Sequence, residues 1–222
     1  MKIYTLIFLL SAGIAACTNS PSDTAKESSE IHESMSMHGD TVSQQTSGFT
    51  TAMHQMMNDM HQIPMSGNVD KDFAIMMKSH HQGAVEMSQY QITNGKDETL
   101  KNMAVKIDQE QKAEIKELER IIESLDKAPK NYDPKKKESG FAQVLDENMQ
   151  MMMDMSKMDT SMATDHQFVA MMIPHHQSAV HMAEGFVQYG KDERLLNLAK
   201  KIIVSQKKEI IDFNNWMNRN KK

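Results

Sequence analysis

Apolar residues recur every three or four positions over most of the chain, which is the period of an amphipathic helix. One such seam follows Asp70 and consists of Phe73, Met77, His80, Ala84 and Met87. Asn94 and Gly95 predict the end of this helix, and Asp97 predicts the start of a second helix that continues to Ile122. No strand pattern competes, so the sequence predicts an all-α protein.

The same plan occurs twice. The segment from Phe73 to Met87 returns 95 positions later as Phe168 to Met182, and the Gly-Lys-Asp-Glu sequence after Asn94 returns at Gly190. Each copy therefore predicts a helical hairpin. A single hairpin leaves its apolar face uncovered, so we expect the two to pack as an antiparallel four-helix bundle with approximate twofold symmetry. Short Met-rich helices at about 50–62 and 142–158 lead into the hairpins.

The first residues are typical of a secretory signal. Lys2 supplies the charge, an apolar run follows, and the small residues Ala15 and Ala16 precede Cys17. This ending resembles a bacterial lipobox, which implies acylation of Cys17 after cleavage, although an ordinary cleaved signal is the alternative. We expect an exported protein, anchored through this lipid in the cell envelope, either facing the periplasm or on the outer membrane.

The composition divides the chain into five segments. We predict a signal peptide at 1–16, a disordered polar tether at 17–48, a first repeat at 49–126, a linker at 127–140 and a second repeat at 141–222. Both repeats belong to one bundle. Cys17 is the only cysteine, so neither a disulfide framework nor a thiolate metal site is available.

Charge and composition narrow the range of possible functions. Without Lys2 the mature chain has 24 basic and 30 acidic residues, a net charge of about −6, and no basic stripe, which argues against nucleic acid as a partner. Aromatic residues make up only 5% of the chain, whereas methionine occurs 23 times. A chain so rich in methionine packs loosely, binds apolar surfaces, or offers sulfur to a soft metal ion.

The duplicated segments combine paired histidines with methionines one turn before them. These side chains are the donors that soft transition metals prefer, and i,i+4 spacing lets a Met and a His chelate one ion from the same side. Packing alone is the competing explanation for methionines on a seam. The candidate metal ligands are Met76, Met77, His80, His81, Met87, Met171, Met172, His175, His176 and Met182.

Polar residues on the second helix of each hairpin lie level with the histidines. We expect these side chains, Gln111 and Glu114 in one copy and Gln206 and Glu209 in the other, to hydrogen-bond the imidazoles and orient them. The first lead-in segment predicts an auxiliary metal cluster of Met and His. Its members are His54, Met56, Met57, Met60, His61 and Met65.

Two features predict unequal surroundings for the histidines. Consecutive helical positions diverge by about 100°, so at most one histidine of each pair lies at the centre of the seam. The second copy also has Pro174 where the first has Ser79, which predicts a kink beside one of the two half-sites.

The second copy resembles the DUF305 family, whose signature is the Met-Ile-Pro-His-His-Gln sequence found here at 172–177, with Gln206 and Glu209 downstream. The first copy departs from it at Lys78 and Ser79. The resemblance covers about residues 50–220. It implies a ferritin-like four-helix bundle, exported or lipid-anchored, and a few relatives are described as periplasmic copper-binding proteins that use Met and His.

Together these features predict a lipoprotein that binds copper, preferentially Cu(I), for sequestration, tolerance or transfer, with copper-handling proteins as partners and no enzymatic activity. Another transition metal is the alternative cofactor. A ferritin-like di-metal oxidase is less consistent with the sequence because no helix carries the Glu-x-x-His motif of such sites. A metal-free envelope module that holds apolar clients is the third hypothesis. The oligomeric state stays open.

Overall fold

A computed structural model describes residues 47–155 and 161–220. This part of the chain contains six α-helices and no strand, which confirms the predicted all-α class. The helices are α1 (Gly48–Gln62), α2 (Val69–Asn94), α3 (Glu98–Ser124), α4 (Gly140–Met155), α5 (Thr164–Tyr189) and α6 (Glu193–Arg219).

The predictions for the signal peptide, for Cys17 and for most of the tether lie outside the described residues. The end of the predicted tether is part of the first helix, since Ser47 caps α1 and Gly48 begins it. None of the described helices is long and apolar enough to cross a membrane.

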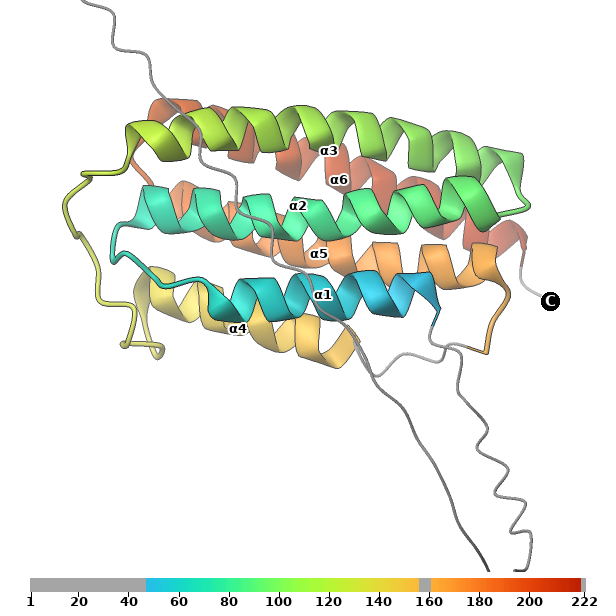
Figure 1. Cartoon of the computed structure of the whole chain (residues 1–222), viewed down its shortest axis with the longest axis horizontal. Helices are drawn as coiled ribbons and strands as arrows, with labels where there is room; N and C mark the ends of the chain where they lie inside the picture. The colour runs from blue at the N-terminus through green and yellow to red at the C-terminus, as the bar shows by residue number, and fades with distance from the viewer. Residues whose placement is uncertain (1–46, 156–160, 221–222) are drawn as a thin grey trace, which may run out of the picture. The chain divides into compact units, whose positions relative to one another are not determined.

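The helices form three layers of two (Figure 1). The hairpins α2–α3 and α5–α6 make the expected four-helix bundle, in which α2 packs against α5. The lead-in helices α1 and α4 cover the opposite face of this central pair. As a result 15 of the 26 residues of α2 are buried, compared with 7 of the 27 residues of α3. The central layer is therefore much more buried than the outer layer of α3 and α6.

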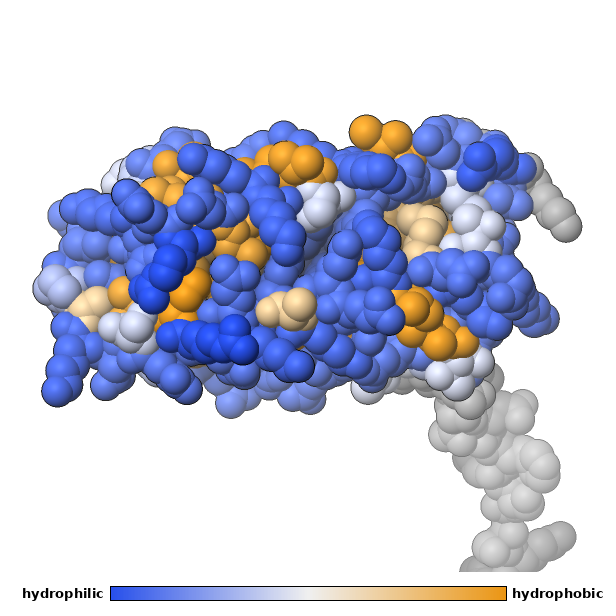
Figure 2. Space-filling view, turned by 90° about the horizontal axis from the view of Figure 1, so that it is seen from above, coloured by the Kyte–Doolittle hydropathy of each residue, from blue (hydrophilic) through white to orange (hydrophobic). Residues whose placement is uncertain are grey.

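The outer layer of α3 and α6 is amphipathic. Figure 2 views the molecule from the side of these helices and shows a largely hydrophilic surface with small, separate hydrophobic patches. The large apolar side chains exposed on these helices are Val105, Val204 and Ile211. Scattered exposure of this kind is ordinary for a folded surface.

Local chemistry accounts for the helix ends. Asp97 and Asp192 cap α3 and α6 as predicted, and each carboxylate accepts from a backbone N–H in the first turn. Gly95 ends α2 for a different reason from the one expected. Its φ is −69°, so no left-handed conformation is needed. A Cβ there would instead lie 2.3 Å from the side-chain nitrogen of Gln91, which packs against the turn.

Two buried or half-buried carboxylates connect the hairpins at equivalent positions. Oδ1 of Asp70, at the start of α2, accepts from the backbone N–H groups of Lys191 and Asp192 in the turn of the second hairpin, at 2.7 and 2.9 Å. Asp165, at the start of α5, accepts in the same way from the turn around Lys96 of the first hairpin. These bonds fix the antiparallel register of α2 and α5.

The linker between the repeats is attached to the loop before α2. Nδ2 of Asn68 donates to the carbonyl of Pro129, and the backbone N–H of Val69 donates to Oδ1 of Asn131. The hydroxyl of Tyr132 donates to the buried carboxylate of Asp72, and burial together with this carboxylate raises the pKa of Tyr132. Part of the segment predicted as a linker is thus integral to the fold.

The Asp70 contact makes a testable contribution to stability. Asp70→Ala leaves two backbone donors without their acceptor and is expected to lower the free energy of unfolding by about 1–3 kcal/mol. Urea denaturation monitored by circular dichroism measures this change. Glu117→Ala, at an exposed position of α3, is the control and should stay within about 0.5 kcal/mol of the original protein. Equal stability of the two variants would contradict the role of Asp70.

Candidate metal centre

The four paired histidines lie together in the middle of the bundle. His80, His81, His175 and His176 have no exposed surface at all. The rings of His80 and His175 face one another across α2 and α5, with centroids 3.8 Å apart and an angle of 42° between their planes. The two copies therefore meet in one centre. The sequence suggested two half-sites without showing that they adjoin.

The other histidine of each pair points toward a glutamate on the second helix of its own hairpin. Nε2 of His81 lies 2.9 Å from Oε2 of Glu114 and forms a hydrogen bond with it. Nε2 of His176 lies 3.0 Å from Oε2 of Glu209, close enough for an ion pair but not aligned as a hydrogen bond. A carboxylate only accepts, so Nε2 of His81 carries the proton and the lone pair of the neutral ring is on Nδ1.

Each glutamate is also bound by a lysine from the opposite hairpin. Lys201 lies 3.3 Å from Glu114, and Lys106 lies 3.1 Å from Glu209. Burial alone would raise the pKa of Glu114, but its bonds to His81 and Lys201 hold the pKa below its ordinary value. The pKa of Glu209 is lowered in the same way, by His176 and Lys106. Each outer histidine thus has an ionised carboxylate beside it.

The surroundings of the two inner histidines differ because of one substitution between the repeats. Nε2 of His80 is hydrogen-bonded to Oγ of Ser178 at 2.7 Å. The position equivalent to Ser178 in the first copy is Gly83, which has no side chain. Sδ of Met56 fills that space, only 2.5 Å from where a Cβ on Gly83 would lie. Neither ring nitrogen of His175 has a hydrogen-bond partner.

The difference at Ser79 and Pro174 is less prominent than the sequence suggested. Helix α5 is continuous from Thr164 to Tyr189 and includes Pro174. Both positions are half-buried, whereas Gly83 and Ser178 are buried beside the imidazoles. The structure thus adds a second difference between the copies, and this one is in contact with the histidines.

Buried ring nitrogens without partners are the main chemical feature of this centre. Nδ1 of all four histidines lacks a hydrogen bond, as does Nε2 of His175 and of His176. Burial, followed by the neighbouring imidazoles, lowers the pKa of His80 and of His175 well below the ordinary value. Both rings are therefore neutral at pH 7 and have lone pairs available. A buried polar atom without a partner lowers the stability of the fold. A bound metal ion would supply the partner that these ring nitrogens lack.

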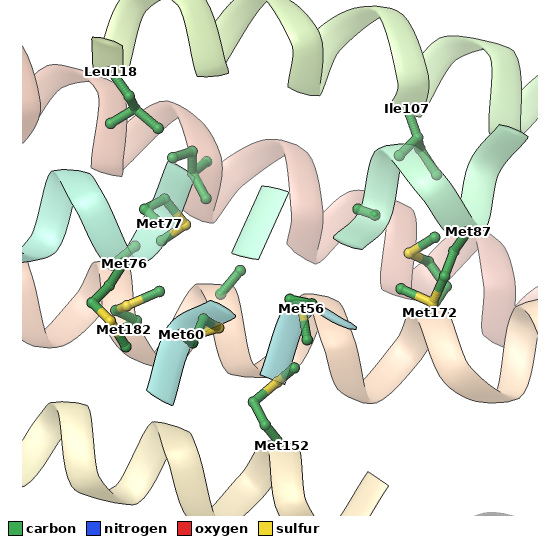
Figure 3. Packing of buried hydrophobic residues seen from close by; sticks show 14 of the residues in the cluster. Met56, Met60, Met76, Met77, Met87, Ile107, Leu118, Met152, Met172 and Met182 are labelled. Atoms are coloured by element: carbon green, nitrogen blue, oxygen red, sulfur yellow. The ribbon is translucent and has the colours of Figure 1, made fainter. Parts of the chain in front are cut away.

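Methionines flank the histidines on both sides along the central helices. Figure 3 shows Met87 of α2 beside Met172 of α5, and Met76 beside Met182 further along the same two helices. The six methionines predicted as ligands are all buried. Within residues 47–155 and 161–220, no group of three or more His, Cys, Asp or Glu side chains is arranged to hold a metal ion. The donors that this region brings together are imidazole nitrogen and thioether sulfur.

The structure places the remaining predicted site residues, the two glutamines and the auxiliary Met/His set, in different surroundings. Gln111 and Gln206 are buried, but Oε1 of each has no partner, and neither side chain bonds a histidine. The auxiliary set does not form one cluster. Met56 and Met60 face the core, Met57 and Met65 are half-buried, and His54 and His61 lie on the exposed side of α1.

Four residues at the centre were missing from the sequence prediction. Ser178 bonds His80, and its hydroxyl also lies 2.9 Å from Sδ of Met152. Lys106 and Lys201 bind the two glutamates. The lysines occupy equivalent positions of the repeat, and Ser178 is one of six positions in the fifteen-residue motif where the copies differ. Comparison of the copies could have revealed all four residues, since Met152 is the equivalent of Met57, which belongs to the predicted auxiliary set.

A family model described as a domain of unknown function, DUF305, matches residues 19–122 and 70–217. The chain belongs to the DUF305 family. The uncharacterized protein L153 of Acanthamoeba polyphaga mimivirus is 40% identical over 57 residues, which are 26% of this chain. The match spans 38% of L153.

Solved structures of CopM share the fold. CopM in the apo form is 27% identical, with a TM-score of 0.53 over 69% of this chain and 98% of CopM. CopM in the Cu(I)-bound form is 28% identical, with a TM-score of 0.52 over 68% of this chain and 96% of CopM. A Cu(II)-bound form of CopM matches this DUF305 protein to the same degree, at 28% identity and a TM-score of 0.52.

The bond between Ser178 and His80 can be tested by removing the hydroxyl. Ser178→Ala leaves Nε2 of His80 buried without a partner, so the metal-free protein should lose about 1–2 kcal/mol of stability. Ser205→Ala, at a half-buried position of α6 away from the histidines, is the control. Nitrogen NMR shifts of the His80 ring should change only in the first variant. A His80 spectrum unchanged by Ser178→Ala would rule out the bond.

The lowered pKa values of the inner histidines predict a loss of stability in acid. Below pH 6.5, near the ordinary pKa of histidine, the unfolded chain binds protons that folded His80 and His175 do not. Unfolding of the metal-free protein should therefore become easier as pH falls, by up to about 1.4 kcal/mol per pH unit for each histidine. Urea denaturation between pH 7.5 and 5.5 measures the slope. His80→Gln combined with His175→Gln should flatten it, and an equal slope would refute the prediction.

Proposed function

We propose that this protein binds copper, preferentially as Cu(I), at the centre formed by the four histidines and the methionines beside them. The observation that carries the proposal is the set of fully buried imidazoles whose Nδ1 atoms have no partner, flanked by buried thioethers from both copies. CopM, which shares the fold and 27–29% of its sequence, has been solved with Cu(I), Cu(II) and Ag bound. These relatives support copper as the ion.

The donor chemistry favours the cuprous ion. Thioether sulfur is soft and needs no deprotonation, so a site of Met and neutral His holds Cu(I) without releasing a proton. A carboxylate beside each outer ring, Glu114 for His81 and Glu209 for His176, orients the imidazole and increases its basicity. The ion would be held by the histidines and methionines, and Glu114 and Glu209 would act through the rings.

We propose further that the protein is exported and anchored by a lipid on Cys17, and that it stores or transfers copper without catalysing a reaction. The sequence up to Cys17 supports export. A thioether site suits an oxidising compartment, where a thiolate ligand would be lost to disulfide formation.

The proposal is tested by titrating the mature full-length chain with Cu(I) in competition with a chromogenic Cu(I) chelator. His80→Gln with His175→Gln, and separately Met87→Leu with Met172→Leu, should each weaken Cu(I) binding by about tenfold or more, or at least ~1.4 kcal/mol. Leucine keeps the volume of methionine, so the fold is retained. Met103→Leu with Met217→Leu is the matched control, because both are half-buried methionines outside the centre.

Affinity unchanged in both test variants would refute the copper centre. Purified protein that carries iron and consumes oxygen would favour the oxidase instead. A copper-sensitivity assay in cells that lack the protein, complemented with each variant, connects the affinity to copper tolerance.

A further inference from the structure

The proposed centre is closed to solvent, so an ion needs a route to it. A cavity of about 170 Å³ lies between the end of α1, the linker and α4, on the side of the central layer that faces away from α3 and α6. Its lining includes the thioethers of Met60, Met65, Met76 and Met149 and the imidazole of His61.

The charged and polar groups of this cavity are already paired. Nζ of Lys137 lies 2.6 Å from Oδ1 of Asp146. The hydroxyl of Tyr132 donates to Asp72, outside the cavity lining. Nδ1 of His61 lies 2.9 Å from the carbonyl of Met57, and a carbonyl only accepts, so Nδ1 carries the proton and Nε2 keeps its lone pair. The uncommitted donors are therefore four sulfurs and one imidazole nitrogen.

Burial of these donors increases from the surface toward the core. His61 is exposed, Met65 and Met149 are half-buried, and Met60 and Met76 are each only 2% exposed. Met76 lies one helical turn before His80 on α2, so its side chain belongs both to the cavity lining and to the flank of the histidine centre. Figure 3 shows Met60 and Met76 directed into the same region between the helices.

We propose that this cavity is a capture site for a soft monovalent cation, Cu(I), which then passes through Met76 to the histidine centre. Thioethers and a neutral imidazole bind such an ion and leave the Lys137–Asp146 pair undisturbed. The capture step stands on the cavity alone, and the transfer step rests on the copper function proposed above.

The cavity combines both copies and the linker: Met60, Met65 and Met76 come from the first repeat, and Met149 comes from α4 of the second. In sequence, the positions equivalent to His61 and Met65 are Ser156 and Thr160, which offer hydroxyls in place of soft donors.

The test uses the mature full-length chain with Ag(I) as a redox-inert probe and Cu(I) as the transferred ion. Protein carrying ¹³C-methyl methionine is titrated with Ag(I), and the methyl signals of Met60, Met65, Met76 and Met149 should shift together. Met65→Leu with Met149→Leu should remove about one equivalent of bound Ag(I). The same variant should slow Cu(I) loading from the chelator by about tenfold, a barrier higher by ~1.4 kcal/mol. Met103→Leu with Met217→Leu should change neither quantity.

The outcomes separate this inference from the copper function. His80→Gln with His175→Gln should lose binding at the centre and keep the cavity methyl shifts, which would support a distinct capture site. Normal loading of the centre by the Met65→Leu, Met149→Leu variant would overturn the route. Methyl signals of Met60, Met65 and Met149 that do not shift while the centre still binds Ag(I) would overturn the capture site and leave the copper function standing.

Discussion

The packing of α2 against α5 buries the imidazoles of four histidines where water cannot reach them. The rest of the structure depends on this constraint. Both helices are covered on both sides, by α3 and α6 on one and by α1 and α4 on the other. Imidazoles in such a layer must find partners inside the protein. Glu114, Glu209 and Ser178 satisfy three of the four rings in part. The nitrogens left over define the chemistry of the centre.

The ionised glutamates beside these rings also receive a positive charge from the surface. Each receives a lysine from the other hairpin, and these contacts lie where α3 and α6 make little other contact. The lysines are half in solvent, so their own contribution to stability is small. They add to the larger effect of His81 and His176, which lowers the pKa values of Glu114 and Glu209. The ionised carboxylates hold both rings in the orientation seen here. Each partly exposed lysine thus acts on a buried imidazole through the glutamate that lies between them.

The sequence predicted the helices, the hairpins and the height at which histidine meets glutamate, because helical periodicity and the duplicated pattern are local. The caps at Asp97 and Asp192 followed from the same reasoning. The contact between His80 and His175 could not be predicted from local sequence, because it depends on the crossing of two helices that are 95 residues apart. That crossing is set by Asp70 and Asp165, and sequence alone gave no reason to connect either carboxylate with a distant turn. The auxiliary Met/His set is divided because α1 presents its residues to core and solvent alike, and only Met60, His61 and Met65 of the set line one cavity.

The single difference between Gly83 and Ser178 has a consequence for the duplication itself. In a homodimer of one repeat, every inner histidine would have the same neighbour by symmetry, and any substitution would appear on both sides of the axis. Tandem fusion within one gene removes that restriction. His80 can be held by a hydroxyl while His175 stays uncommitted across a gap of a few ångströms. Joining the copies in one chain therefore allows the two inner histidines to differ: His80 is held by a hydrogen bond, and His175 keeps both ring nitrogens without a partner.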